Sequence, residues 1–234
     1  MEFKNTKVWG FEHALRSIRI PKNSWNKSDS HYGCDNKMDC EKCRTGDEGC
    51  VNYKNNYIIG EDDMKIVQTL IKAEPKRRKF MKHIMVSVDI VAPLYWWNTY
   101  KIGKTTDSIS AMYKLTTMPI TLESFETDDY DKTLSFADDS SQDDELDHIS
   151  AFEEDVIMVL ENLRQKYLKT KDERYWKELI RWLPESWLQT MTITLNYEDI
   201  RNMYLQWKNH KFVDWVENLP YGKELIMYEE KNNK

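Results

Sequence analysis

The residues best suited to chemistry in this sequence are its four cysteines, which stand close together in a polar segment near the N-terminus: Cys34, Cys40, Cys43 and Cys50. Four thiolates at such short spacing, with a Cys-x-x-Cys pair at their centre, can hold Zn²⁺ tetrahedrally and give shape to a polar loop. An iron–sulfur cluster also takes four thiolates, and reduced, unligated cysteines would equally suit the cytosol. The pattern predicts a zinc site and leaves these two alternatives open.

Other residue types that often carry catalysis form no recognisable pattern. The five histidines include no His-x-x-x-His pair, and none stands with Ser and Asp in an order that indicates a hydrolase. Gly103-Lys104-Thr105 looks like the end of a phosphate-binding loop, but Asn98 occupies the position where that loop requires a glycine. With seven glycines and no Gly-x-Gly-x-x-Gly, a glycine-rich dinucleotide cradle is excluded as well.

Charge and hydropathy narrow the classes of partner. The formal net charge of −6 disfavours general binding to nucleic acid, which needs Lys and Arg to neutralise phosphates. The basic run Lys76-Arg77-Arg78-Lys79 and the acidic stretch 128–147 depart from this average, and both are interpreted as solvated surface. The most apolar stretch, 90–97, is too short to span a bilayer, and the N-terminus has no apolar signal. We therefore expect a soluble, cytoplasmic protein.

The elements that must position these residues follow from hydrophobic spacing. Helical spacing predicts helices at 11–20, 61–73, 151–169 and 172–182, after Asn196, and from about Phe212 to Pro220. Alternating apolar residues predict strands at 83–90, ended by Pro93, and at 190–195. Asn196 should cap the helix that follows it, with Asp199 three residues further on. Because strands and helices intermix without a regular βαβ order, the α+β class is favoured.

The organisation of the chain follows from its length and from its polar segments. A chain of 234 residues suits one domain, so we expect a single domain over 1–234. The polar segment at about 22–60, which holds the cysteines, is too long for an ordinary connection and is interpreted as an insertion. The acid-rich segment at about 126–150 is interpreted as a flexible surface loop.

From about residue 61 to 220, the order of these segments resembles the flavin-dependent thymidylate synthases. Phe80-Met81-Lys82-His83-Ile84, the strand after it and Ala92-Pro93-Leu94-Tyr95 are similar to that family's Phe-Glu-His-like turn, strand and Ala-Pro-aromatic exit. Leu183-Pro184 and Thr194-Leu195-Asn196 resemble its Leu-Pro and Thr-Val-Asn segments. The resemblance implies a thymidylate synthase-like fold, with a central, mostly antiparallel sheet and flanking helices.

The same resemblance implies a cofactor, a substrate and an assembly. Asn196, Asn202 and His210 fall where the family's residues contact FAD, so the resemblance gives them that role here. It gives Lys104, Ser110 and Tyr113 the role of lining the site for a pyrimidine nucleotide. It also implies a homotetramer, because the family builds its sites between subunits.

One departure limits what the resemblance implies about activity. The family has Arg-His-Arg, then a Ser, then Ser-Gly-Arg-Tyr, where this chain has Ile102-Gly103-Lys104 and Ser110-Ala111-Met112-Tyr113. The family's arginines bind flavin and nucleotide phosphate, and one lysine replaces a planar guanidinium fork poorly. The departure argues against ordinary methylation of dUMP.

Three alternative functions are compatible with these sequence features. The first is a divergent flavin-dependent enzyme, resembling thymidylate synthase, that modifies a pyrimidine nucleotide. The second is a catalytically inactive nucleotide-binding derivative of the same fold. The third is a protein-interaction module with a metal-bound insertion.

Overall fold

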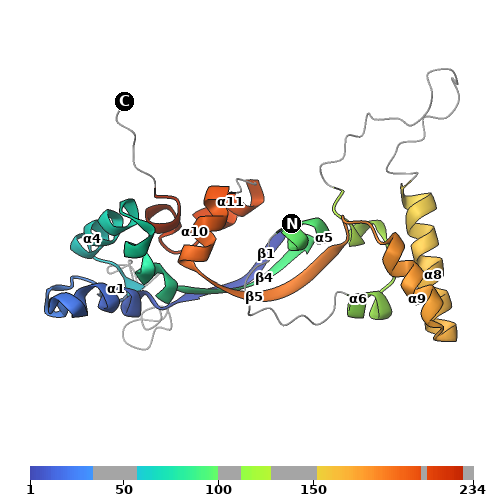
Figure 1. The fold of residues 1–234 in the computed structure, drawn as a ribbon, viewed down its shortest axis with the longest axis horizontal. Coiled ribbons are helices and arrows are strands. Elements are labelled where there is room, and N and C mark those ends of the chain that lie inside the picture. The colour runs from blue at the N-terminus through green and yellow to red at the C-terminus, as the bar shows by residue number, and fades with distance from the viewer. Residues whose placement is uncertain (34–56, 100–111, 128–151, 207–209, 229–234) are drawn as a thin grey trace, which may run out of the picture. The chain divides into compact units, whose positions relative to one another are not determined.

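Three strands form the larger sheet of the computed structural model, which describes residues 1–33, 57–99, 112–127, 152–206 and 210–228 (Figure 1). They are β1 (Glu2–Trp9), β4 (Met85–Pro93) and β5 (Leu188–Asn196), in the order β1-β4-β5. A smaller sheet pairs β2 (His31–Tyr32) with β3 (Tyr57–Ile58) in antiparallel register.

The helices of the described residues are mostly short. The α-helices are α1 (Phe11–Arg19), α4 (Glu61–Lys72), α5 (Leu94–Thr99), α6 (Met112–Thr117), α8 (Met158–Thr170), α9 (Glu173–Trp182), α10 (Tyr197–Gln206) and α11 (His210–Glu217). Short 3₁₀ turns are η1 (Ile20–Lys22), η2 (Trp25–Lys27), η4 (Pro75–Arg77), η5 (Lys79–His83) and η6 (Leu122–Ser124). Two π-helical segments are η7 (Phe152–Ile157) and η8 (Gly222–Ile226). In this part of the chain, none of these helices could cross a bilayer.

Three contacts fix the direction of β5 against β4. The Tyr197 N–H donates to the Ile84 carbonyl at 3.0 Å, and the Leu94 N–H donates to the Trp187 carbonyl at 3.1 Å. Between them, the Thr192 hydroxyl donates to the Asp89 carboxylate at 2.6 Å. Because residue numbers rise along one strand as they fall along the other, the two strands are antiparallel. The predicted α+β class and antiparallel sheet are confirmed.

By its internal contacts the chain divides into two compact units. Unit 1 contains Met1–Lys4 and Asp89–Ile193, and unit 2 contains Asn5–Val88 and Thr194–Lys234. The single domain expected over 1–234 stays a prediction.

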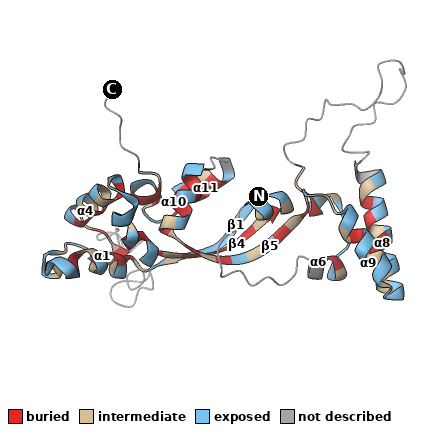
Figure 2. Ribbon diagram, viewed as in Figure 1, coloured by how far each residue is buried: buried red, intermediate tan, exposed pale blue. Residues whose placement is uncertain are grey.

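The core of unit 1 lies between a helical hairpin and the residues around Trp187. Its buried side chains are Leu115, Ile120, Phe125, Ile157, Leu160, Leu163, Leu179 and Trp187. The hairpin consists of α8 and α9, which both carry buried residues in Figure 2. Lys171 turns the chain between them at a φ of 57°, and Asp172 caps α9 by accepting from the Arg174 N–H at 2.9 Å. These helices confirm the predictions at 151–169 and 172–182.

The core of unit 2 forms where α1, α4, η5 and α10 bury apolar faces. Phe11 packs edge-to-face against Tyr197 and Tyr221, with ring centroids 5.7 and 5.5 Å apart. On α10, Ile200, Met203 and Tyr204 are buried, as the helical spacing predicts. The helices predicted at 11–20 and 61–73 are present as α1 and α4.

Three elements begin two residues away from the predicted start, one of them β5, which begins at Leu188 instead of residue 190. The strand expected from residue 83 begins at Met85, because His83 still belongs to the 3₁₀ turn η5. The helix expected near Phe212 begins at His210. Strand β1 has no counterpart in the sequence interpretation, because its residues are mostly polar and exposed.

Candidate functional site

The first residue predicted to contact flavin, Asn196, lies at the junction of β5 and α10 in unit 2. Its side-chain Oδ1 accepts from the Asp199 N–H at 2.9 Å, and its Nδ2 donates to the Asp199 carboxylate at 2.6 Å. Asn196 is therefore the N-cap of α10, as the sequence predicts. The cap uses one N–H and one oxygen lone pair of the amide, so each polar atom keeps one further hydrogen bond for a ligand.

Asn202 has a different environment from Asn196. It is exposed on α10, between Arg201 and Met203, which are both buried. Glu198 lies one turn earlier on the same face, at the i, i+4 spacing that brings two helical side chains together. The amide of Asn202 is therefore accessible to a ligand, beside a carboxylate.

The turn η5 contributes the other wall of this candidate site. The backbone bond from Tyr197 to Ile84 ties the start of α10 to the residue after η5. The Lys82 ammonium lies 3.5 Å from Glu198 Oε2, which is buried and accepts no hydrogen bond from the described residues. This oxygen of Glu198 therefore faces the Lys82 ammonium and not solvent.

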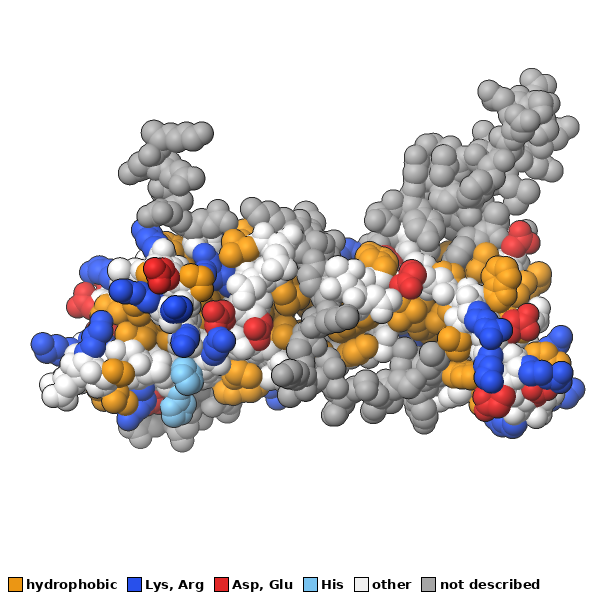
Figure 3. All heavy atoms as spheres, in the orientation of Figure 1, with side chains coloured by type: hydrophobic (Ala, Val, Ile, Leu, Met, Phe, Trp, Pro, Cys, Tyr) orange, Lys and Arg blue, Asp and Glu red, His pale blue; other side chains and the backbone are white. Residues whose placement is uncertain are grey.

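Positive charge surrounds η5. Lys72, Lys76, Arg77, Lys79 and Lys82 are all exposed, and Glu74 is the one acid in the same stretch, 72–83. Figure 3 shows Lys and Arg side chains gathered on the face of unit 2 that it draws. This surface favours an anionic ligand beside α10.

His210 and the predicted nucleotide residues are only partly described. His210 is the first residue of α11 and Tyr113 belongs to α6, but the structure describes the side chain of neither. Lys104 and Ser110 lie outside the described residues.

Lys114, which the sequence interpretation missed, directly follows Tyr113. Its ammonium lies 5.2 Å from the centroid of the Trp187 ring and donates to the Leu188 carbonyl at 3.3 Å. Burial lowers the pKa of Lys114. Its position beside the predicted substrate residue Tyr113 is the signal that could have found it.

The four cysteines predicted to bind zinc also lie outside the described residues, as does 128–150 of the predicted acidic loop. Tyr32 pairs with Tyr57 across the β2–β3 hairpin, so the two ends of the cysteine-containing segment lie side by side. Within the described ranges, no group of three or more His, Cys, Asp or Glu side chains could hold a metal ion. The zinc site stays a prediction.

The fold that positions these residues is an α+β fold known from solved structures. No protein-family model matches the chain, and no curated protein matches it either. The chain is similar to flavin-dependent thymidylate synthase ThyX from Helicobacter pylori, complexed with FAD and dUMP. The TM-score is 0.54 at 16% identity, over 97% of this chain and 98% of that chain. A second ThyX structure from Helicobacter pylori, also with FAD and dUMP, gives a TM-score of 0.53 at 16% identity, over 97% of each chain. This chain therefore has a ThyX-like fold over nearly its whole length, as the resemblance implies.

The two asparagines should differ in their effect on stability. Asn196→Ala removes the N-cap of α10 and is expected to lower the free energy of unfolding by about 1 kcal/mol. Asn202→Ala removes an exposed side chain, so its change should stay within about 0.5 kcal/mol. Urea unfolding of both variants measures the difference. Equal losses would contradict the assignment of Asn196 as the cap.

Proposed function

We propose that this chain is a flavoprotein that binds FAD and a pyrimidine nucleotide and is related in activity to the flavin-dependent thymidylate synthases. The observation that supports this most is the near-complete overlap with a ThyX structure that holds FAD and dUMP. The reaction we propose is a reductive modification of the nucleotide, in which bound FAD, once reduced by an external hydride donor, would pass a hydride to the nucleotide. Ordinary methylation of dUMP is not part of the proposal, since the arginine signature is replaced by Ile102-Gly103-Lys104.

The residues around α10 and η5 fit a flavin nucleotide. The exposed Asn202 amide can both donate and accept a hydrogen bond, and the Glu198 carboxylate lies one helical turn away on the same face. The diphosphate of FAD is anionic, and η5 carries the exposed Lys79 and Lys82, of which Lys82 lies 3.5 Å from Glu198. Asn202 and Glu198 would orient the flavin, while the lysines would neutralise its diphosphate.

The rest of the proposed site comes from the resemblance. His210 would contact the flavin, and Lys104, Ser110 and Tyr113 would line the nucleotide site. We also propose a homotetramer, as the resemblance implies.

A second function is supported by the same loss of the arginine signature. In that case the fold binds a nucleotide and catalyses nothing, because the groups that hold flavin and phosphate together are missing. The colour of the purified protein separates the two functions. A yellow preparation with the absorption of oxidised flavin supports the enzyme, whereas nucleotide binding without flavin supports the inactive derivative.

FAD titration of the wild type and of Asn202→Ala tests the site directly. Losing a hydrogen bond to the flavin should weaken FAD binding roughly three- to tenfold. Asn26→Ala is the matched control, because Asn26 is an exposed asparagine of η2 in the same unit. Quenching of flavin fluorescence measures the affinities. A wild type that takes up no FAD at high micromolar concentration would refute flavin binding, and equal affinity in Asn202→Ala would refute the role of this residue.

A further inference from the structure

Lys114 is a partly buried cation of unit 1. It is half-buried at the edge of the unit 1 core, since the neighbouring Leu115 and the Trp187 ring beneath its ammonium are both fully buried. Among the described residues no carboxylate compensates its charge, and the lowered pKa of Lys114 has burial as its cause. A desolvated ammonium without a counter-ion destabilises a fold.

The contacts of Lys114 use only part of the hydrogen-bonding capacity of its ammonium group. It donates to the Leu188 carbonyl at 3.3 Å and rests over the face of an indole ring at 5.2 Å. An ammonium has three N–H donors, so one carbonyl leaves hydrogen-bonding capacity unused. The side chain is only half-buried, so a small anion can reach that remaining capacity from solvent.

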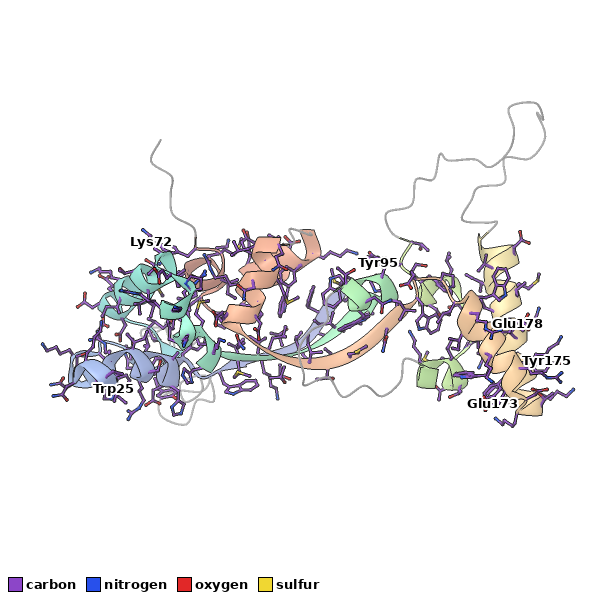
Figure 4. The ribbon with its side chains drawn as sticks, viewed as in Figure 1. Trp25, Lys72, Tyr95, Glu173, Tyr175 and Glu178 are labelled. Atoms are coloured by element: carbon purple, nitrogen blue, oxygen red, sulfur yellow. The ribbon has the colours of Figure 1, made fainter. Side chains whose placement is uncertain are left out.

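The other lysines of unit 1 that the structure describes are exposed, unlike Lys114. Lys166 also lies over an aromatic ring, 5.5 Å from the centroid of Tyr175, which is labelled in Figure 4. Lys166 is exposed, however, so water completes its hydrogen bonding. The contact with a ring is therefore not what sets Lys114 apart; among the described lysines of unit 1, its partial burial is.

We propose that Lys114 binds the phosphate of the nucleotide substrate. This inference rests on the proposed function and deepens it, because it names the cation that serves the phosphate in place of the missing arginines. A phosphate monoester supplies anionic oxygens that can accept the unused ammonium N–H groups and compensate the charge. Lys114 follows Tyr113, which is proposed to line the nucleotide site, directly in α6.

Binding of dUMP and of deoxyuridine, measured by calorimetry, tests the proposal. Wild type should prefer dUMP, and Lys114→Met should weaken dUMP binding at least tenfold while leaving deoxyuridine binding unchanged. Lys114→Arg keeps the charge and should recover part of the loss, and Lys166→Met should bind like wild type. If the ratio of the affinities for dUMP and deoxyuridine is the same in Lys114→Met as in wild type, the proposal is overturned.

Thermal unfolding provides a readout that does not depend on nucleotide binding. Because the charge is unfavourable in the ligand-free fold, Lys114→Met should unfold at a temperature equal to or roughly 2 °C above that of wild type. Inorganic phosphate should stabilise wild type and leave Lys114→Met unchanged. If wild type binds neither dUMP nor deoxyuridine but shows this phosphate effect, the nucleotide function fails while the anion site at Lys114 stands. If inorganic phosphate affects both proteins equally, the anion site fails.

Discussion

Replacing Asp63 with alanine is expected to lower the free energy of unfolding by about 3–5 kcal/mol, because it leaves a buried guanidinium without its counter-ion. Asp63 is 1% exposed and Arg19 is 5% exposed, so neither charge is solvated by water. The Asp63 carboxylate accepts from Arg19 Nε, from the Ser28 hydroxyl at 2.5 Å and from the Ser30 hydroxyl at 2.6 Å. One substitution thus removes the acceptor of three buried or partly buried donors.

The neighbouring Asp62 provides the matched control for this prediction. It is exposed at the start of the same helix and pairs with Lys65 at 3.2 Å, so Asp62→Ala should change the free energy of unfolding by less than about 0.5 kcal/mol. Urea unfolding followed by tryptophan fluorescence compares the two midpoints. If Asp63→Ala does not fold, the double variant Arg19→Met with Asp63→Leu should fold again, because apolar residues can replace a buried pair. Equal midpoints for Asp62→Ala and Asp63→Ala would contradict the prediction.

Helix α4 illustrates which features could be predicted from sequence. Its apolar spacing and its first-turn acids indicate a helix at 61–73, and the structure has it at Glu61–Lys72. The cap of α4 could not be predicted in this way. It is the Asp29 carboxylate, which accepts from the Asp62 and Asp63 N–H groups at 2.8 and 3.1 Å. The cap and the helix are separated by the whole cysteine-containing segment. Local patterns carry no information about such a contact.

Strand β1 was missed for a related reason. Its sequence, Glu2 to Trp9, is mostly polar and exposed, so no alternation of apolar residues marks it. It is held by pairing with β4, whose Val86, Val88, Ile90 and Ala92 supply the buried face. An edge strand can depend on its partner for burial, and hydrophobic periodicity then fails to detect it.

In the candidate site, too, features that depend on local sequence could be predicted, and features that depend on distant contacts could not. Asn196 could be identified as a cap because a strand, an asparagine and an acid three residues later are local signals. The pairing of Lys82 with Glu198 could not, because η5 and α10 lie far apart in sequence. A lysine in a short helix is ordinarily interpreted as surface. Lys114 becomes half-buried only because Trp187, before β5, lies beneath its ammonium.

The second large effect is expected at Gly10, between β1 and α1. Its φ of 99° lies in the left-handed region, where side chains are strained, and a Cβ there would lie 2.0 Å from the His83 carbonyl oxygen. Because this oxygen belongs to the backbone of η5, no side-chain rotation can relieve the clash. Gly10→Ala should therefore lower the free energy of unfolding by about 3 kcal/mol, from strain and overpacking together.

The same substitution links the fold to the proposed flavin site. Relief of the clash requires η5 to move, and η5 carries Lys82, which pairs with Glu198 of α10. Gly10→Ala protein that still folds should therefore bind FAD more weakly than wild type. Gly33→Ala is the control. The nearest atom to a Cβ added at Gly33 lies 3.3 Å away and belongs to the exposed side chain of His31, which can move aside. The effects of Gly33→Ala on stability and on FAD binding should therefore be small. Urea unfolding and FAD titration of both variants check the prediction, and a Gly10→Ala protein as stable as Gly33→Ala would show that η5 yields at this contact without cost.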